Sequence, residues 1–207
     1  MKLFFHFCPS GFSNCFLLGS DSPNETSQRE AILVDPGNMD SGVLRLIEDN
    51  DYSLRGVLIT HDHAHHVRGL KTIMKIYDTE IFAINPVIME YRTTLVKDGD
   101  IINIGPFKTE VISIPGHSAD SAIFKIERFL FTGDALTAGL VGNTASSYAS
   151  ATQASALQKK LFSLPGDYTV LPGHGPPTSL EAERRFNHGM ISSQPRLNRR
   201  PVFRFDF

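Results

Sequence analysis

Short runs of apolar residues recur along the chain and are separated by polar turns rich in glycine and proline. Such runs, four to eight residues long and often β-branched, predict strands, and a continuous apolar run is typical of a strand buried on both faces. The clearest continuous runs are residues 31–34 and 56–60. The predicted strands are residues 2–8, 15–19, 31–34, 56–60, 80–84, 101–104, 107–114, 121–126, 128–132 and 168–171.

Four segments place apolar residues at the period of an amphipathic helix or carry a helix start signal. They are residues 43–47, 67–77, 152–162 and 178–187. The last segment opens with Thr178 and Glu181, which match the capping box that satisfies free backbone N–H groups. Residues 142–148 predict a loop, in which Tyr148 is either a solvent-exposed aromatic or part of a substrate pocket.

About ten strands and four or five helices alternate in two similar halves, which predicts one α/β domain over residues 1–187. Residues 188–207 depart from this pattern. They are basic, and residues 201–207 alternate apolar and charged side chains. This tail is either a loosely held terminus or an extra strand that docks on a sheet edge, such as that of a partner subunit in a homodimer.

Composition and charge are those of an ordinary globular protein and disfavour several classes of function. The chain has 207 residues, of which 41% are hydrophobic and 20% are charged. Its formal net charge of −2 does not favour binding to nucleic acid. No stretch has the length of a membrane-spanning helix or of a secretory signal, so we expect a cytoplasmic protein with no membrane attachment. Cys8 and Cys15 are too few for a disulfide framework, and we expect buried free thiols.

The most distinctive stretch directly follows the predicted strand 56–60. Four histidines and one aspartate fall within six residues, in the order His61-Asp62-His63-Ala64-His65-His66. Imidazole is a borderline-soft ligand that suits zinc, iron, copper and nickel. Crowded imidazoles that titrate near neutral pH destabilise a fold unless a cation binds them, so this stretch predicts a metal site.

Three further motifs offer a histidine or an aspartate just after a predicted strand, beside glycine or proline. They are Pro115-Gly116-His117, Gly133-Asp134 and Pro172-Gly173-His174. Glycine lets the backbone approach a ligand closely, and proline fixes the turn. Because α/β folds place their sites at strand ends, we expect these side chains to supply the remaining ligands. His6 and His188 lie outside the motifs and are expected to be surface or packing residues.

Together these motifs resemble those of the metallo-β-lactamase superfamily of metallohydrolases, and especially its short glyoxalase II-like branch. The usual pattern there is Thr-His-x-His-x-Asp-His, then Pro-Gly-His, Gly-Asp and Pro-Gly-His-Gly. The resemblance extends over about residues 2–187, and the Asp-Pro-Gly of residues 35–37 matches a turn that precedes the first helix in that family. It implies a four-layer αβ/βα sandwich with metals at the edge between two sheets.

The resemblance also implies a ligand set. In that set a first ion is held by His61, His63 and His117. A second ion is held by His66 and His174, and Asp134 bridges the two ions. A hydroxide between the ions would attack the substrate. Two divalent ions about 3.5–4 Å apart polarise a carbonyl and generate hydroxide near neutral pH. The cofactors expected are two zinc ions, with iron or manganese as alternatives.

One position departs from the family, because His65 stands where the family usually has an aspartate. A ligating neutral imidazole has no lone pair left to accept a proton from bound water. The loss of a negative charge would acidify that water and favour anionic substrates. Alternatively, His65 is a bystander and the second site is weak or empty, and Asp62 then orients a histidine ligand or caps a helix. His65 and Asp62 are therefore candidate catalytic residues.

The leading functional prediction is a metal-dependent hydrolase of a small-molecule thioester, ester or lactone. Glutathione specificity is not expected, because no glutathione-holding helical segment of the glyoxalase II type is evident and residues 143–145 replace the usual Arg-Thr-Asp. A second class is an oxidoreductase of the persulfide dioxygenase type, with one iron on His61, His117 and Asp134. A phosphodiesterase-type hydrolase of the same superfamily and a catalytically silent metal-binding module are further alternatives.

Overall fold

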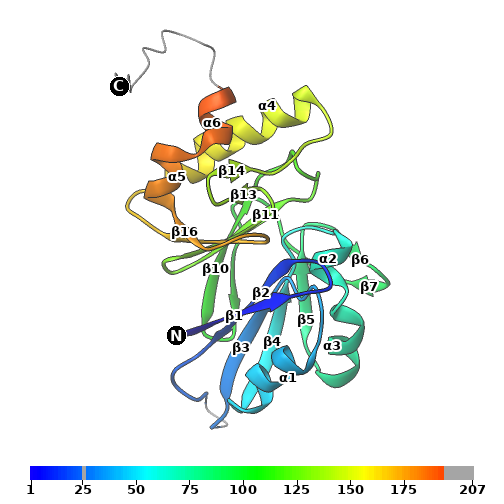
Figure 1. Ribbon diagram of the computed structural model, residues 1–207. Helices are drawn as coiled ribbons and strands as arrows, with labels where there is room; N and C mark the ends of the chain where they lie inside the picture. The colour runs from blue at the N-terminus through cyan, green and yellow to red at the C-terminus, as the bar shows by residue number, and fades with distance from the viewer. Residues whose placement is uncertain (25–26, 194–207) are drawn as a thin grey trace, which may run out of the picture.

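Two six-stranded sheets face each other at the centre of the computed structural model, which describes residues 1–24 and 27–193 (Figure 1). The first sheet contains, in spatial order, β1 (Lys2–Cys8), β2 (Ser13–Gly19), β3 (Arg29–Val34), β4 (Tyr52–Leu58), β5 (Glu80–Ala83) and β8 (Thr94–Leu95). The second contains β16 (Thr178–Ser179), β15 (Thr169–Pro172), β12 (Phe129–Gly133), β11 (Ala122–Ile126), β10 (Phe107–Ser113) and β9 (Ile101–Ile104). Two small hairpins pair β6 (Val87–Ile88) with β7 (Tyr91–Arg92) and β13 (Leu136–Thr137) with β14 (Leu140–Val141).

Helices cover the outer faces of both sheets, so the fold has four layers (Figure 1). The first sheet is covered by α1 (Ser41–Glu48) and α3 (Leu70–Ile76), and the second by α4 (Ser147–Ala156), its π-helical continuation Leu157–Leu161, and α5 (Leu180–Phe186). Phe16 and Phe131 pack between the sheets with their ring centroids 5.6 Å apart. The predicted four-layer αβ/βα sandwich is therefore confirmed.

Strand direction brings the candidate ligands to one end of the sandwich. In the first sheet β3, β4 and β5 are parallel, and in the second β12 and β15 are parallel. The histidine stretch follows β4, Asp134 follows β12 and His174 follows β15. Since parallel strands end at the same edge of their sheet, the candidate ligands meet where the two sheets' carboxyl ends face each other.

The segment predicted as one helix over residues 67–77 forms two, α2 (Ala64–Val67) and α3. Gly69 lies between them and donates its backbone N–H to the carbonyl of Pro36. A Cβ at Gly69 would lie 2.5 Å from that carbonyl oxygen, so the close approach of the two backbones interrupts the helix.

Helix α4 begins earlier than predicted, at Ser147. Ser146 caps it, because its hydroxyl accepts a hydrogen bond from the backbone N–H of Ala149. Tyr148 therefore lies in the first turn of a helix rather than in a loop. Its side chain is exposed to solvent.

The capping box predicted from Thr178 and Glu181 is wrong. The N-cap of α5 is Ser179, whose hydroxyl accepts a hydrogen bond from the Ala182 N–H. Thr178 instead pairs with Val170 across β15 and β16, which keeps it extended. The helix consequently starts one residue later than the capping box predicts.

The folded chain continues past residue 187 as α6 (His188–Ser193), which contacts α4 and β14. The predicted docking strand over residues 201–207 falls outside the described residues. Cys8 and Cys15 are buried free thiols, as predicted. Among the described residues no helix is both long and apolar enough to cross a membrane.

Candidate metal centre

The carboxylate of Asp134 lies at the centre of the predicted ligands. Its Oδ2 is equally close to four imidazole nitrogens, at 3.7, 3.6, 3.6 and 3.5 Å from the Nε2 atoms of His61, His65, His117 and His174. Its other oxygen, Oδ1, is 3.4 Å from Nε2 of His66. One carboxylate therefore faces ligands from both sheets, which suits a bridge between two cations.

Three imidazole nitrogens converge on one side of Asp134. Nδ1 of His63 lies 2.9 Å from Nε2 of His61 and 3.1 Å from Nε2 of His117. Ligands 2.0–2.1 Å from a tetrahedral zinc ion are about 3.3 Å apart. The spacing of these three nitrogens is therefore close to that of a shared metal ion.

Two overlapping groups of donor atoms could each hold a metal ion, since all donors of a group lie within 4.8 Å of one another. The first group contains His61, His63, His65 and Asp134, and the second contains His65, His66, Asp134 and His174. His65 and Asp134 are common to both groups. His65 is thus a member of the cluster rather than a distant bystander.

Several of these donor atoms are buried without a hydrogen-bond partner in the part of the chain that the structure describes. They are Nε2 of His65, Nε2 of His66 and Oδ1 of Asp134. An unpaired buried polar atom costs about 1–3 kcal/mol, so most native proteins avoid several in one place. A divalent cation would satisfy all three atoms, and the residues present therefore fit a metal.

Backbone carbonyls orient two of the histidines through Nδ1, the ring nitrogen that does not face Asp134. Nδ1 of His174 lies 2.7 Å from the carbonyl oxygen of Phe12, and Nδ1 of His117 lies 2.8 Å from that of Asn143. A carbonyl can only accept, so each Nδ1 carries the proton. The Nε2 lone pair of each ring is then free to bind a cation.

Asp35 faces the buried His66, a role that was not predicted from the sequence. Its Oδ1 accepts a hydrogen bond from the Thr60 N–H at 2.8 Å, and its Oδ2 accepts one from the Thr60 hydroxyl at 2.6 Å. The same Oδ2 lies 3.2 Å from Nδ1 of His66. Asp35 has a left-handed φ of 49°, which is unusual for a residue before proline. The available signal was the Asp-Pro-Gly turn directly after a buried strand.

Two glycines leave the room that the cluster needs. A Cβ at Gly173 would lie 2.5 Å from Oδ1 of Asp134 and 2.5 Å from Cε1 of His66. A Cβ at Gly37 would lie 2.0 Å from the carbonyl oxygen of His65. Any larger residue at either position would push a candidate ligand out of place.

The electrostatics of the cluster favour an ionised Asp134 and a neutral His61. Burial lowers the pKa of His61 to about 3, and neighbouring His66 adds to the shift. Burial opposes ionisation of Asp134, but the positive charge of His66, whose Nε2 lies 3.4 Å from Oδ1, outweighs burial and holds the pKa of Asp134 well below its usual range. For His66 the carboxylates of Asp35 and Asp134 outweigh burial and raise its pKa to about 9. A metal that binds His66 must therefore displace a proton at neutral pH.

Asp62 lies outside this arrangement. Its side chain is exposed, and its backbone N–H donates to Oδ2 of Asp120 at 2.9 Å. Burial and the Asp120 carboxylate raise the pKa of Asp62. Helix α2 begins after His63 without a side-chain cap, so the predicted capping role of Asp62 is wrong. The carboxylate that faces a histidine of the cluster is that of Asp35, not that of Asp62. His6 is also remote from the cluster and pairs with Asp40 at 3.0 Å.

A hollow of about 280 Å³ opens beside the cluster. Its lining consists of His117, Asp134, Thr137, Leu140, Val141, Gly142, Asn143 and His174. The β13–β14 hairpin thus forms one wall. This lining includes neither a lysine nor an arginine, and Tyr148 is not part of it.

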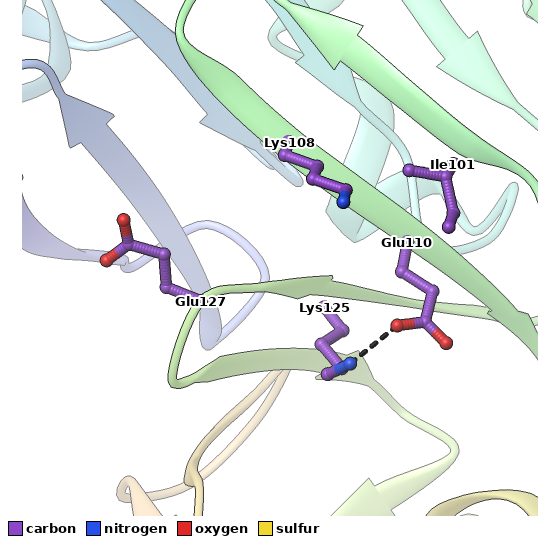
Figure 2. Close-up of a pocket in the computed structure, with 5 residues that line it drawn as sticks. All are labelled: Ile101, Lys108, Glu110, Lys125 and Glu127. Carbon is purple, nitrogen blue, oxygen red and sulfur yellow. Dashed lines mark hydrogen bonds and ion pairs between the residues drawn. The ribbon is translucent and has the colours of Figure 1, made fainter.

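A second hollow of similar volume lies on strands β9 to β11 (Figure 2). Its charged side chains are Lys108, Glu110, Lys125 and Glu127. Lys125 donates to Oε2 of Glu110 at 2.5 Å, so these two charges are already paired. Since no candidate ligand lines it, this hollow is not part of the metal centre.

The fold and the converging histidines define a site of the metallohydrolase type. The family model of the metallo-beta-lactamase superfamily matches residues 9–174, and the chain belongs to this superfamily. An uncharacterised protein of Mycobacterium tuberculosis is 29% identical over 208 residues, covering 84% of this chain and 91% of that protein.

Two further comparisons lie within the same superfamily. A hydroxyacylglutathione hydrolase of Francisella tularensis is 34% identical over 147 residues, which cover 70% of this chain but only 58% of that relative. The crystal structure of ETHE1 from Myxococcus xanthus superposes with a TM-score of 0.79 at 25% identity, covering 94% of this chain and 86% of that one. The predicted superfamily and its glyoxalase II-like relatives are therefore confirmed.

Proposed function

We propose that the protein is a hydrolase that uses two divalent metal ions to cleave an ester or thioester bond of a small molecule. The observation that carries this proposal is the sharing of Asp134 by two groups of imidazole donors. In the proposed assignment, His61, His63 and His117 hold the first ion, His65, His66 and His174 hold the second, and Asp134 contacts both. Zinc suits a site this rich in imidazole, with iron and manganese as alternatives.

Metal ions in this position supply a polarised carbonyl and an activated water. The chain's own residues prepare the site for that chemistry. Asp134 stays ionised because its pKa is lowered by His66 despite burial. The carbonyls of Phe12 and Asn143 hold two imidazoles in the tautomer that presents Nε2. The ligands are thereby oriented before a metal binds, which lowers the cost of binding.

His65 gives the proposed centre one more positive charge than an aspartate would. Support for its role comes from its Nε2, which is buried, has no hydrogen-bond partner among the described residues and lies 3.6 Å from Asp134. A ligating imidazole has no further acceptor, so it cannot take the proton of an attacking water. The added charge would instead stabilise negative charge on the substrate and in the transition state.

The hollow beside the cluster suggests which substrates fit. Leu140 and Val141 offer an apolar wall for a small acyl group, and the residues that line the hollow include neither a lysine nor an arginine to bind a distant anionic group. We therefore propose that the substrate is a small ester or thioester. Any negative charge that it carries should lie close to the reacting carbonyl, where the metal ions would face it. A glutathione thioester, the substrate named for the Francisella relative, is the less favoured candidate.

A turnover assay tests the proposal. Zinc-loaded protein should hydrolyse members of a panel of short-chain esters, thioesters and lactones without oxygen, and Asp134→Ala should abolish the activity. His6→Ala is the control, because this histidine lies outside the cluster. Absence of turnover on the whole panel at full metal occupancy would contradict the proposal. Oxygen consumption with a persulfide that requires iron would favour the oxidoreductase alternative instead.

A further inference from the structure

The free edge of the first sheet is long and aromatic. Among the described residues β1 pairs with β2 alone, so the backbone groups on its other side have no strand partner. Phe5 and Phe7, two residues apart on this strand, are 50% and 45% exposed. Proteins usually shorten, charge or cover such edges, because an open apolar edge promotes aggregation. This edge therefore needs a cover.

An apolar groove runs along this edge, with a volume of about 350 Å³. We call it the β1 groove, and it is lined by Phe5, Phe7, Asn14, Gly175, Pro176 and Pro177. Asn14 on β2 holds the segment that follows β15 against the groove, because its side-chain amide donates to the carbonyls of Pro172 and Gly175 at 2.9 and 2.7 Å. The groove is thus preformed between the two sheets.

The chain carries a segment that matches this groove in chemistry and in spacing. Residues 201–207 read Pro-Val-Phe-Arg-Phe-Asp-Phe, with Phe203, Phe205 and Phe207 at every second position. In an extended strand these three side chains share one face, as Phe5 and Phe7 do on β1. Backbone hydrogen bonds along the edge and aromatic side chains in the groove are the two elements of recognition by strand addition.

We propose that residues 201–207 of this same chain add a strand to β1 and place their phenylalanines in the β1 groove. The length of chain is sufficient. From Pro177 in the groove to Ser193, the two short helices α5 and α6 limit the separation to about 30 Å. The ten residues from 194 to Phe203 span up to about 34 Å when extended. A tethered segment also has an effective concentration in the millimolar range, which favours it over a second copy.

Hydrogen exchange on the full chain tests this proposal. The β1 amides that do not pair with β2 should exchange about tenfold faster in Phe205→Asp than in the unmodified protein, because the variant places a charge in the apolar groove. Phe186→Asp is the matched control, since this phenylalanine is 73% exposed on α5 and outside the groove. It should leave β1 exchange unchanged.

A second variant keeps the test independent of the tail's own sequence. Phe7→Ser should speed tryptic cleavage after Arg204 about tenfold, because an undocked segment is open to the protease. Equal β1 exchange in Phe205→Asp and in the unmodified protein would overturn the proposal. So would protection that rises with protein concentration together with a dimeric elution volume, since the tail of a second copy would then occupy the groove.

Discussion

Oδ2 of Asp35 lies 3.2 Å from Nδ1 of His66, and both side chains are buried. The carboxylate is itself held by two hydrogen bonds from Thr60, one from the backbone N–H and one from the hydroxyl. His66 therefore faces a carboxylate that is held between the residues that follow β3 and β4. The candidate metal site thus includes a contact between the residue that follows β3 and helix α2.

Asp35→Asn should lower metal affinity at the proposed second site by about 10- to 100-fold, the usual effect of losing a group that orients a ligating histidine. The change removes the negative charge that faces His66 while it preserves side-chain size. Competition with a coloured chelator measures the affinity. Asp62→Asn is the control, because that carboxylate is exposed. Equal affinities in the two variants would show that the Asp35 contact is unimportant.

Gly173→Ala should prevent metal binding without unfolding the protein. The added methyl group would lie 2.5 Å from both Asp134 and His66, so one of these side chains must move away from the centre. Gly175→Ala controls for backbone strain, because this glycine has a φ of 78° but open space around its Cβ position. The control should lose about 1–2 kcal/mol of stability and keep its metals. Metal analysis and thermal melting separate the two effects, and full occupancy in Gly173→Ala would be inconsistent with this geometry.

His65→Asp should strengthen the second metal site and raise the pH at which hydrolysis reaches half its maximum, by about one pH unit. An aspartate adds a negative charge, which stabilises bound cations but makes the attacking water less acidic. A pH–rate profile at full metal occupancy measures the shift. A profile identical to that of the unmodified protein would mean that residue 65 does not influence the attacking water.

Glu183→Ala should raise KM with little change in metal content. The buried carboxylate accepts hydrogen bonds from the Gly139 N–H, Thr178 and Asn187, and Gly139 is the turn of the hairpin that walls the hollow. Loss of these acceptors leaves buried donors unpaired and costs about 1–3 kcal/mol. Glu181→Ala is the control, because this glutamate is on the same helix but pairs with Arg185 at the surface. An unchanged KM for Glu183→Ala would show that the β13–β14 hairpin does not contribute to substrate binding.

Stability should fall in acid partly through Asp40. Burial opposes ionisation of this carboxyl group, but the hydrogen bonds from His6 and from the backbone of Val43 and Gly42 outweigh it and lower its pKa. A group whose pKa is lower in the folded state stabilises the fold above its unfolded pKa of about 3.9, and this contribution is lost as the pH falls further. Asp40→Asn keeps the N-cap but not the charge. Its urea unfolding should be less pH-dependent than that of the unmodified protein between pH 5 and about 2, and parallel curves would contradict this assignment.

Much of the fold was predictable because strand period and turn residues are local signals. Residues 56–60 and the glycine-flanked His117 and His174 indicated strand ends, and the structure has them there. The break at Gly69 was not predictable, because it depends on a backbone contact with Pro36 that is remote in the sequence. The start of α4 was missed because Ser146 is one of several small polar residues that could cap a helix.

In the candidate site, too, local motifs were predictable from the sequence and contacts between distant residues were not. The four histidines of residues 61–66, together with His117, Asp134 and His174, were identified from their motifs, and the structure brings all seven side chains into one cluster. Asp62 was considered for an orienting role only in the alternative in which His65 is a bystander, and Asp35 was not considered for it. Asp35 acts across two parallel strands, and only the fold reveals that contact.

Elemental analysis of protein purified without added metal tests most directly whether seven side chains, Asp134 among them, hold two ions. We expect close to two divalent ions per chain, both lost in Asp134→Ala and both kept in His6→Ala. One ion or fewer in the unmodified protein, or two ions retained by Asp134→Ala, would contradict it.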